Sequence, residues 1–209
     1  RERTMPKKIG IAIVTIGAVL IFSALLLFLH NRHEDIQAGR EAESLLERIE
    51  AAMDTTEPPY CTPLAPQMPT VMLDGYEYVG YIEIPALNLK LPVMSEWSYS
   101  RLKIAPCRQF GSSRTDDLVI AAHNYKSHFG HLKDLSAGDI VVFTDMDHIA
   151  NSYSVEKIET LKPNEVGAVQ YSGYDLVLYT CTKGGETRVT VFCNRISNVA
   201  DPSSVLQEK

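Results

Sequence analysis

Cys181 and His123 are the two residues whose types and positions best suit nucleophilic chemistry. Cys181 ends the apolar, β-rich run 175–180 and precedes a glycine-rich turn, where a substrate could reach its sulfur. His123 ends the apolar run 118–122 and faces a polar loop. A neighbouring histidine can take the thiol proton and leave a nucleophilic thiolate. Because no Cys or His spacing typical of a zinc site accompanies them, we interpret the two residues as a nucleophile pair.

Arg188 is the third candidate, seven positions after Cys181. If residues 182–187 form a hairpin turn, Arg188 returns beside the cysteine at the start of the next strand. Its guanidinium could then donate hydrogen bonds to a substrate carbonyl or an oxyanion, and its charge would favour the thiolate. An arginine that is merely solvated at a strand start is the alternative interpretation.

The other cysteines have weaker claims to chemistry. Cys193 lies inside an apolar run and is best interpreted as a small buried hydrophobe. Cys61 lies in a proline-rich segment and Cys107 in a loop, and a disulfide between them stays open on sequence grounds. Four cysteines in 209 residues do not indicate a disulfide-rich scaffold.

Short β-rich runs separated by turn signals must position the candidate residues. The pattern predicts a closed β-barrel or a sandwich from about residue 76 onward, with one helical turn at 129–135. The predicted strands are 78–84, 118–122, 140–144, 153–161, 175–180 and 188–196.

The N-terminus carries a membrane signal. No charged side chain occurs from Ile9 to Leu29, and a helix of that length matches the hydrocarbon core of a bilayer, about 30 Å thick. Basic residues in segment 1–8 predict a cytoplasmic N-terminus, with the bulk of the chain outside the cell. A cleavable signal peptide is the alternative, but the run is long and no small-x-small site follows it.

Between anchor and barrel we expect a stalk and a linker. Residues 34–53 carry one apolar stripe at helical spacing, which predicts a helical stalk over 30–57 that packs weakly on the domain. Five prolines between Pro58 and Pro69 predict an extended linker over 58–75. The barrel would occupy 76–200, and a tail 201–209.

Composition excludes several classes of protein. With 45% hydrophobic and 22% charged residues, the chain is too apolar for a disordered protein. A net charge of −6 without a basic run argues against a nucleic-acid binder.

Taken in order, the motifs resemble a sortase, the membrane-anchored cysteine transpeptidase of Gram-positive bacteria. Each motif is weak alone, but the order together with the anchor is specific. The segments are Tyr81-Ile82-Glu83-Ile84-Pro85, Leu89-Lys90-Leu91-Pro92-Val93, Ala121-Ala122-His123-Asn124, Phe129-Gly130-His131-Leu132, Leu135-Ser136-Ala137-Gly138-Asp139 and Leu178-Tyr179-Thr180-Cys181, followed by Arg188.

The resemblance implies a closed eight-stranded β-barrel with short helices and assigns roles to its residues. Cys181 would be the nucleophile, His123 the general acid/base and Arg188 the stabiliser of substrate and tetrahedral intermediate, while Thr180 would bind substrate. No metal or organic cofactor is required. Two positions depart from the family pattern: Val177 replaces a threonine and Ala122 a glycine.

The implied reaction is a two-step acyl transfer. Cys181 would cleave a C-terminal sorting motif resembling Leu-Pro-x-Thr-Gly on secreted proteins, and an amine of peptidoglycan or a pilin lysine would resolve the acyl-enzyme. A tethered protease that hydrolyses the intermediate and a non-enzymatic wall-binding domain are the alternatives. His123-Asn124 and Phe129-Gly130 look like class B, although fewer residues than a class B helix needs lie between 161 and 175. We favour cell-wall anchoring and keep pilin polymerisation open.

Overall fold

The computed structural model describes residues 7–54 and 65–196 and divides into two compact units. The first unit, residues 1–37, contains helix α1 (Lys7–Asp54) as far as residue 37. This helix includes one stretch that is long and apolar enough to cross a membrane, and none of that stretch is buried against protein. The predicted apolar helix is therefore present.

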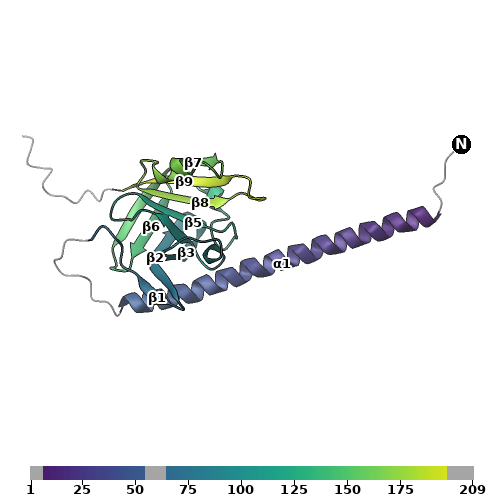
Figure 1. Cartoon of the computed structure of the whole chain (residues 1–209), viewed down its shortest axis with the longest axis horizontal. Coiled ribbons are helices and arrows are strands. Elements are labelled where there is room, and N and C mark those ends of the chain that lie inside the picture. Colours follow the sequence, from purple (N-terminus) through teal and green to yellow (C-terminus); the bar gives the residue numbers. More distant parts are fainter. Residues whose placement is uncertain (1–6, 55–64, 197–209) are drawn as a thin grey trace, which may run out of the picture. The chain divides into compact units, whose positions relative to one another are not determined.

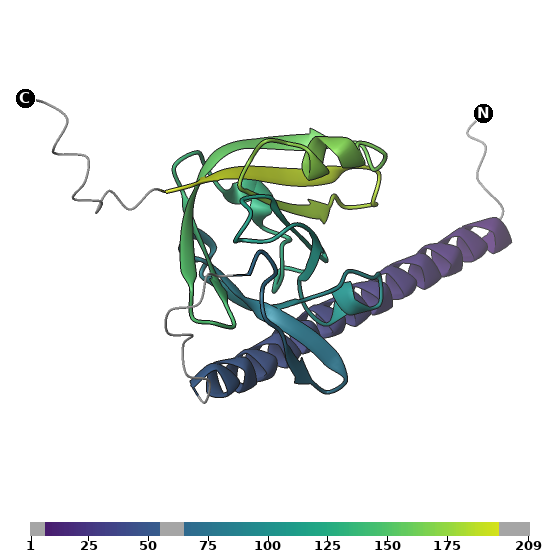
Figure 2. The same cartoon turned by 60° about the vertical axis from the view of Figure 1, so that its left-hand side comes forward.

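The second unit, residues 38–209, is built around a closed barrel of eight strands (Figures 1 and 2). The order around the barrel is β2-β3-β4-β5-β8-β9-β7-β6, and pairing of β2 with β6 closes it. The pairs β3–β4 and β5–β8 are parallel and the others antiparallel. The predicted eight-stranded barrel is confirmed. The strands are β2 (Tyr76–Ile84), β3 (Leu89–Met94), β4 (Cys107–Phe110), β5 (Leu118–Ala122), β6 (Ile140–Asp145), β7 (Ala150–Leu161), β8 (Leu176–Cys181) and β9 (Arg188–Arg195).

Alternation along the strands fills the barrel with aliphatic and aromatic side chains. Ile82, Ile120, Leu178 and Val191 are fully buried in one core cluster. Closure between β2 and β6 depends on Gly80, which has a φ of 144°. A Cβ atom there would lie 2.0 Å from the Thr144 carbonyl oxygen, so only glycine lets the two strands meet.

A short strand, β1 (Val71–Leu73), pairs with the start of β2 as a hairpin. The sequence placed these residues in the linker, because three residues among prolines are too few to show a strand pattern. Two barrel strands also escaped sequence analysis: β3 contains Pro92, and β4 is only four residues long and half polar.

The C-terminal part of α1 packs closely on the barrel. Its apolar stripe, Ala42, Leu45, Ile49 and Met53, is buried, and Ile49 is fully covered. The last three of these side chains cluster with outward-facing side chains of β2, β3 and β4. The weak packing expected for the stalk is therefore wrong, since the stripe meets an apolar outer face of the barrel. Burial of each large side chain contributes about 1.5–3 kcal/mol.

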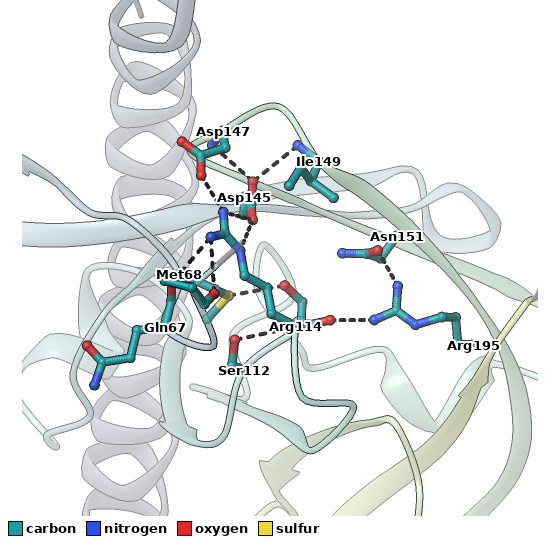
Figure 3. A network of polar contacts seen from close by, with 11 residues as sticks. Gln67, Met68, Ser112, Arg114, Asp145, Asp147, Ile149, Asn151 and Arg195 are labelled. Atoms are coloured by element: carbon teal, nitrogen blue, oxygen red, sulfur yellow. Dashed lines mark hydrogen bonds and ion pairs between the residues drawn. The ribbon is translucent and has the colours of Figure 1, made fainter. Parts of the chain in front are cut away.

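A buried polar network joins three loops on one side of the barrel (Figure 3). The Arg114 guanidinium donates to Asp145 Oδ2 at 2.8–3.0 Å and to Asp147. It also donates to the carbonyls of Ala65 and Gln67, so it ties the start of the described post-linker segment to the barrel. Asp145 is fully buried, and its other oxygen accepts from two backbone N–H groups of the β6–β7 turn.

Candidate active site

The strand register pairs Cys181 with Arg188 and ends β5, one residue before His123, beside the end of β8. The parallel pairing of β5 with β8 ends at Ala122 opposite Thr180, and His123 is the first residue after β5 while Cys181 is the last residue of β8. On the other side of β8, Cys181 pairs directly with Arg188 of β9. Neighbouring strands lie about 4.8 Å apart. The barrel therefore gathers three residues that span 65 positions of the sequence, from His123 to Arg188.

Beside Cys181 lies a groove on the outer surface of the barrel. Tyr179 and Thr190 contribute to its lining from β8 and β9, along with Cys181 and Arg188. Trp97 and Tyr99 line it from the β3–β4 connection, and Val166 and Val169 line it from helix α2 (Val166–Gln170). Helix α2 has only five residues, in line with the short segment available between β7 and β8. A mostly apolar groove next to a thiol suits an extended peptide.

Cys181 is half-buried and a free thiol, whereas Cys107 and Cys193 are fully buried. Burial in apolar surroundings raises the pKa of both buried thiols to about 12, because the thiolate would lose its hydration. Neither buried thiol is thus a nucleophile near neutral pH. The Cys61–Cys107 disulfide is not tested, because Cys61 lies outside the described residues.

His123 begins a compact loop that its own backbone holds in shape. Its carbonyl accepts a hydrogen bond from Phe129 N, and the Tyr125 carbonyl accepts from His128 N and Gly130 N. Phe129 is buried in the barrel core and anchors the loop. A Cβ atom at Gly130 would lie 2.7 Å from the Asn124 and Tyr125 carbonyl oxygens, so the loop requires glycine there.

The ring of Tyr125 stacks on the imidazole of His123, with centroids 4.0 Å apart and planes inclined by 16°. Sequence analysis missed this tyrosine. The spacing of His123 and Tyr125 does not distinguish a stacked ring from a solvated loop residue. The turn of the loop determines how the two rings lie relative to each other.

Arg188 lies beside Cys181, as the predicted hairpin requires. The turn is closed by hydrogen bonds between Thr182 and Thr187. The guanidinium Nη1 donates to the carbonyls of Gly185 (2.9 Å) and Thr187 (3.0 Å), and the side chain lines the groove. Its charge is therefore held next to Cys181 by the turn itself.

Thr180, which the sequence resemblance assigns to substrate binding, is buried behind the groove. Its side chain is 3% exposed and its hydroxyl donates to the Ala122 carbonyl at 2.9 Å. Strand alternation turns Thr180 away from the groove that Tyr179 and Cys181 line. Its side chain links β8 to β5 immediately before the two candidate catalytic residues.

Tyr179 is a groove residue that sequence analysis did not single out. It lies two residues before Cys181 on the same face, and its hydroxyl donates to Gln109 Oε1 at 2.5 Å. The period-two alternation could have identified it. In the part of the chain that the structure describes, no group of three or more His, Cys, Asp or Glu side chains could hold a metal ion.

Comparisons with known proteins bear on the family and the fold of the chain. The model of the sortase domain matches residues 82–196, more than half of the chain. A comparison with curated proteins found no match.

Solved structures give the same fold. Sortase C1 of Streptococcus agalactiae is 29% identical, with a TM-score of 0.52, covering 61% of this chain and 72% of that protein. Sortase C of Streptococcus pneumoniae is 26% identical, with a TM-score of 0.52, covering 81% and 91%. A sortase D5 transpeptidase of Clostridium perfringens, 16% identical with a TM-score of 0.54 and coverage of 76% and 97%, shares the fold. The class B-like features are not confirmed by these matches. The domain match and the barrel together place the chain in the sortase family, as a sortase-type transpeptidase.

Proposed function

We propose that the protein joins the carboxyl end of a sorting-motif protein to an amine through a thioester on Cys181. The observation that carries the proposal is the strand register, which pairs Cys181 with Arg188 at the groove and ends β5 beside β8, one residue before His123. Cys181 is the nucleophile because it is the half-exposed thiol among the described cysteines.

His123 acts as general acid and base. It accepts the thiol proton as the sulfur attacks the threonine carbonyl of the motif, and it returns that proton to the leaving amine. An incoming amine then attacks the thioester, gives its proton to His123 and releases Cys181 as thiolate. The protons and bonds of both steps balance without a cofactor.

Arg188 stabilises the oxyanion of the two tetrahedral intermediates. Its remaining N–H groups are donors in a groove with apolar walls, where a charge-assisted hydrogen bond is worth more than in water. The short hairpin pairs Arg188 with Cys181 across neighbouring strands, and its backbone carbonyl at Gly185 accepts a hydrogen bond from the guanidinium.

The amine acceptor is a pilin lysine or a peptidoglycan amine. The similarity to sortases C, one of them described with its pilin substrate specificity, supports the pilin lysine. We therefore favour pilin polymerisation over the cell-wall anchoring that was favoured on sequence grounds.

We further propose that α1 crosses the membrane once, with the N-terminus in the cytoplasm and the barrel outside. Basic residues before the apolar stretch support this orientation.

A ligation assay tests the proposed function. The full chain in detergent micelles is incubated with a labelled Leu-Pro-x-Thr-Gly peptide library, with and without triglycine or a pilin-derived lysine peptide. We expect an amine-dependent ligation product and, by mass spectrometry, an acyl adduct on Cys181. Hydrolysis alone at every amine concentration would identify a protease instead. Unchanged turnover in Cys181→Ala would refute the catalytic role of this cysteine.

A further inference from the structure

We propose that Tyr125 is a positioning residue for His123, whose ring fixes the plane of the imidazole and stabilises its protonated form. The inference rests on the proposed function, in which His123 carries the proton of Cys181. It adds a residue to the acid–base machinery that neither the motifs nor the register identify.

The contact is a stack within a small ring cluster. Tyr125 covers one face of the His123 imidazole at a centroid distance of 4.0 Å, nearly parallel to it. His128 is the third ring of the cluster and is fully buried. Its centroid lies 5.5 Å from that of Tyr125, and the two ring planes are inclined by 66°. Tyr125 therefore contacts both a buried ring and the half-buried candidate base.

The loop backbone keeps the two rings in register. The Tyr125 carbonyl accepts from His128 N at 3.0 Å and from Gly130 N at 2.8 Å, and the His123 carbonyl accepts from Phe129 N at 3.2 Å. Both residues thus have fixed backbones. The imidazole can still rotate about its side-chain bonds, and a stacked ring restricts that rotation.

The stack also has a preferred charge state. A cation over the face of an aromatic ring is attracted by the ring's quadrupole, and a neutral imidazole gains less. His123 is an imidazolium between taking the proton of Cys181 and giving it to the leaving amine. The ring of Tyr125 therefore stabilises the state that holds this proton.

Other charges act on His123 at the same time. The titratable and charged groups on the elements around it include Cys181 of β8 and Arg188 of β9, with His128 in its own loop. The thiolate favours the imidazolium and the guanidinium opposes it. Since these groups are the same in every Tyr125 variant, a comparison of variants isolates the contribution of the ring.

The test compares Tyr125→Phe, which keeps the ring, with Tyr125→Leu, which removes it, in the full chain in detergent micelles. Tyr171→Leu is the matched control, because Tyr171 is 79% exposed and does not line the groove. Two readouts are used: kcat and KM on a fluorogenic Leu-Pro-x-Thr-Gly peptide, and the titration of His123 by NMR, assigned through its loss in His123→Gln. A thermal melt checks that each variant is folded.

We expect Tyr125→Leu to lower kcat about tenfold with KM within about twofold, equivalent to about 1.4 kcal/mol in the transition state. The pKa of His123 falls in that variant, while Tyr125→Phe and Tyr171→Leu match the unmodified chain in both readouts. Equal kcat and equal His123 titration in Tyr125→Leu would overturn the proposal. So would a Tyr125→Phe variant as impaired as Tyr125→Leu, since the hydroxyl rather than the ring face would then matter.

The two proposals fail separately. If the unmodified chain does not process the peptide, the proposed function fails for that motif. The His123 titration in the three variants still decides whether the ring stabilises the imidazolium. If the peptide is processed and the titration does not move, only the role of Tyr125 is lost.

Discussion

At the scale of single residues, burial separates the cysteines by reactivity. Cys107 and Cys193 have pKa values raised to about 12, whereas Cys181 opens onto the groove. The thiolate reacts with alkylating agents and the thiol does not.

We therefore expect iodoacetamide at pH 8 to modify Cys181 in the folded chain and to spare Cys107 and Cys193. Peptide mass spectrometry after brief labelling measures this, in a Cys61→Ser background so that the linker cysteine does not contribute. In 6 M guanidinium chloride all three thiols should react. Modification of Cys193 as fast as Cys181 in the folded chain would contradict the burial argument.

Thr180 supplies a second prediction at this scale. Thr180→Val keeps the shape but loses the hydrogen bond to the Ala122 carbonyl, so the free energy of unfolding should fall by about 1 kcal/mol. Because the side chain faces away from the groove, kcat should fall more than KM rises. Peptide kinetics and urea unfolding check both effects. A large rise in KM with unchanged stability would restore the substrate-binding role predicted from sequence.

At the scale of elements, the loop after β5 depends on the absence of a side chain at Gly130. In Gly130→Ala, the new Cβ would press on the Asn124 and Tyr125 carbonyls at 2.7 Å. These carbonyls belong to the segment that carries His123 and its stacked ring. We expect a loss of at least tenfold in kcat and of about 1–3 kcal/mol in stability.

The matched control for Gly130 is Gly167→Ala in α2, where a Cβ would meet nothing within 4 Å. That variant should be neutral or more stable by about 0.5–1 kcal/mol, since alanine loses less backbone freedom in a helix. Thermal melts and peptide turnover of the two variants decide the matter. Equal effects at the two positions would refute the steric argument.

The network around Asp145 gives a stability prediction for the loops. Asp145→Ala leaves the Arg114 guanidinium, 7% exposed, without its main buried partner, and breaking a buried pair costs about 3–5 kcal/mol. Glu159→Ala removes a partner from the exposed pair with Lys157 and should cost no more than about 1 kcal/mol. Urea unfolding measures both values. A cost below 1 kcal/mol for Asp145→Ala would show that the loops do not depend on the network.

At the scale of the whole molecule, the chain divides within the long helix and not after it. The second unit begins at Ala38, and the stripe from Ala42 to Met53 is buried on the barrel. The functional fragment should therefore keep the end of the helix, although the sequence alone suggests that the stalk is dispensable.

We predict that a fragment beginning at residue 38 folds and retains peptide turnover without detergent. A fragment beginning at residue 55 exposes the apolar faces of β2–β4 and should lose at least 4 kcal/mol of stability, the contribution of two to three large buried side chains. Gel filtration and thermal melts of the two fragments measure this. Equal melting temperatures would show that the helix packing contributes nothing.

Much of this architecture follows from the sequence. Short β-rich runs separated by turn signals predicted six strands, and an uncharged N-terminal stretch predicted an apolar helix. Strand ends followed by loops indicated His123 and Cys181 as candidates, and the seven positions from Cys181 to Arg188 fit a hairpin. These features are local, so residue type and spacing are enough to predict them.

Tertiary structure decided what depends on partners far apart in the chain. It turned Thr180 inward, packed the helix stripe on the outer barrel face and placed Tyr125 against His123. It also recruited Trp97 and Val166 to one groove from segments nearly 70 residues apart. The physical reason is that periodicity shows which residues share a face, whereas register and loop hydrogen bonds determine which faces meet.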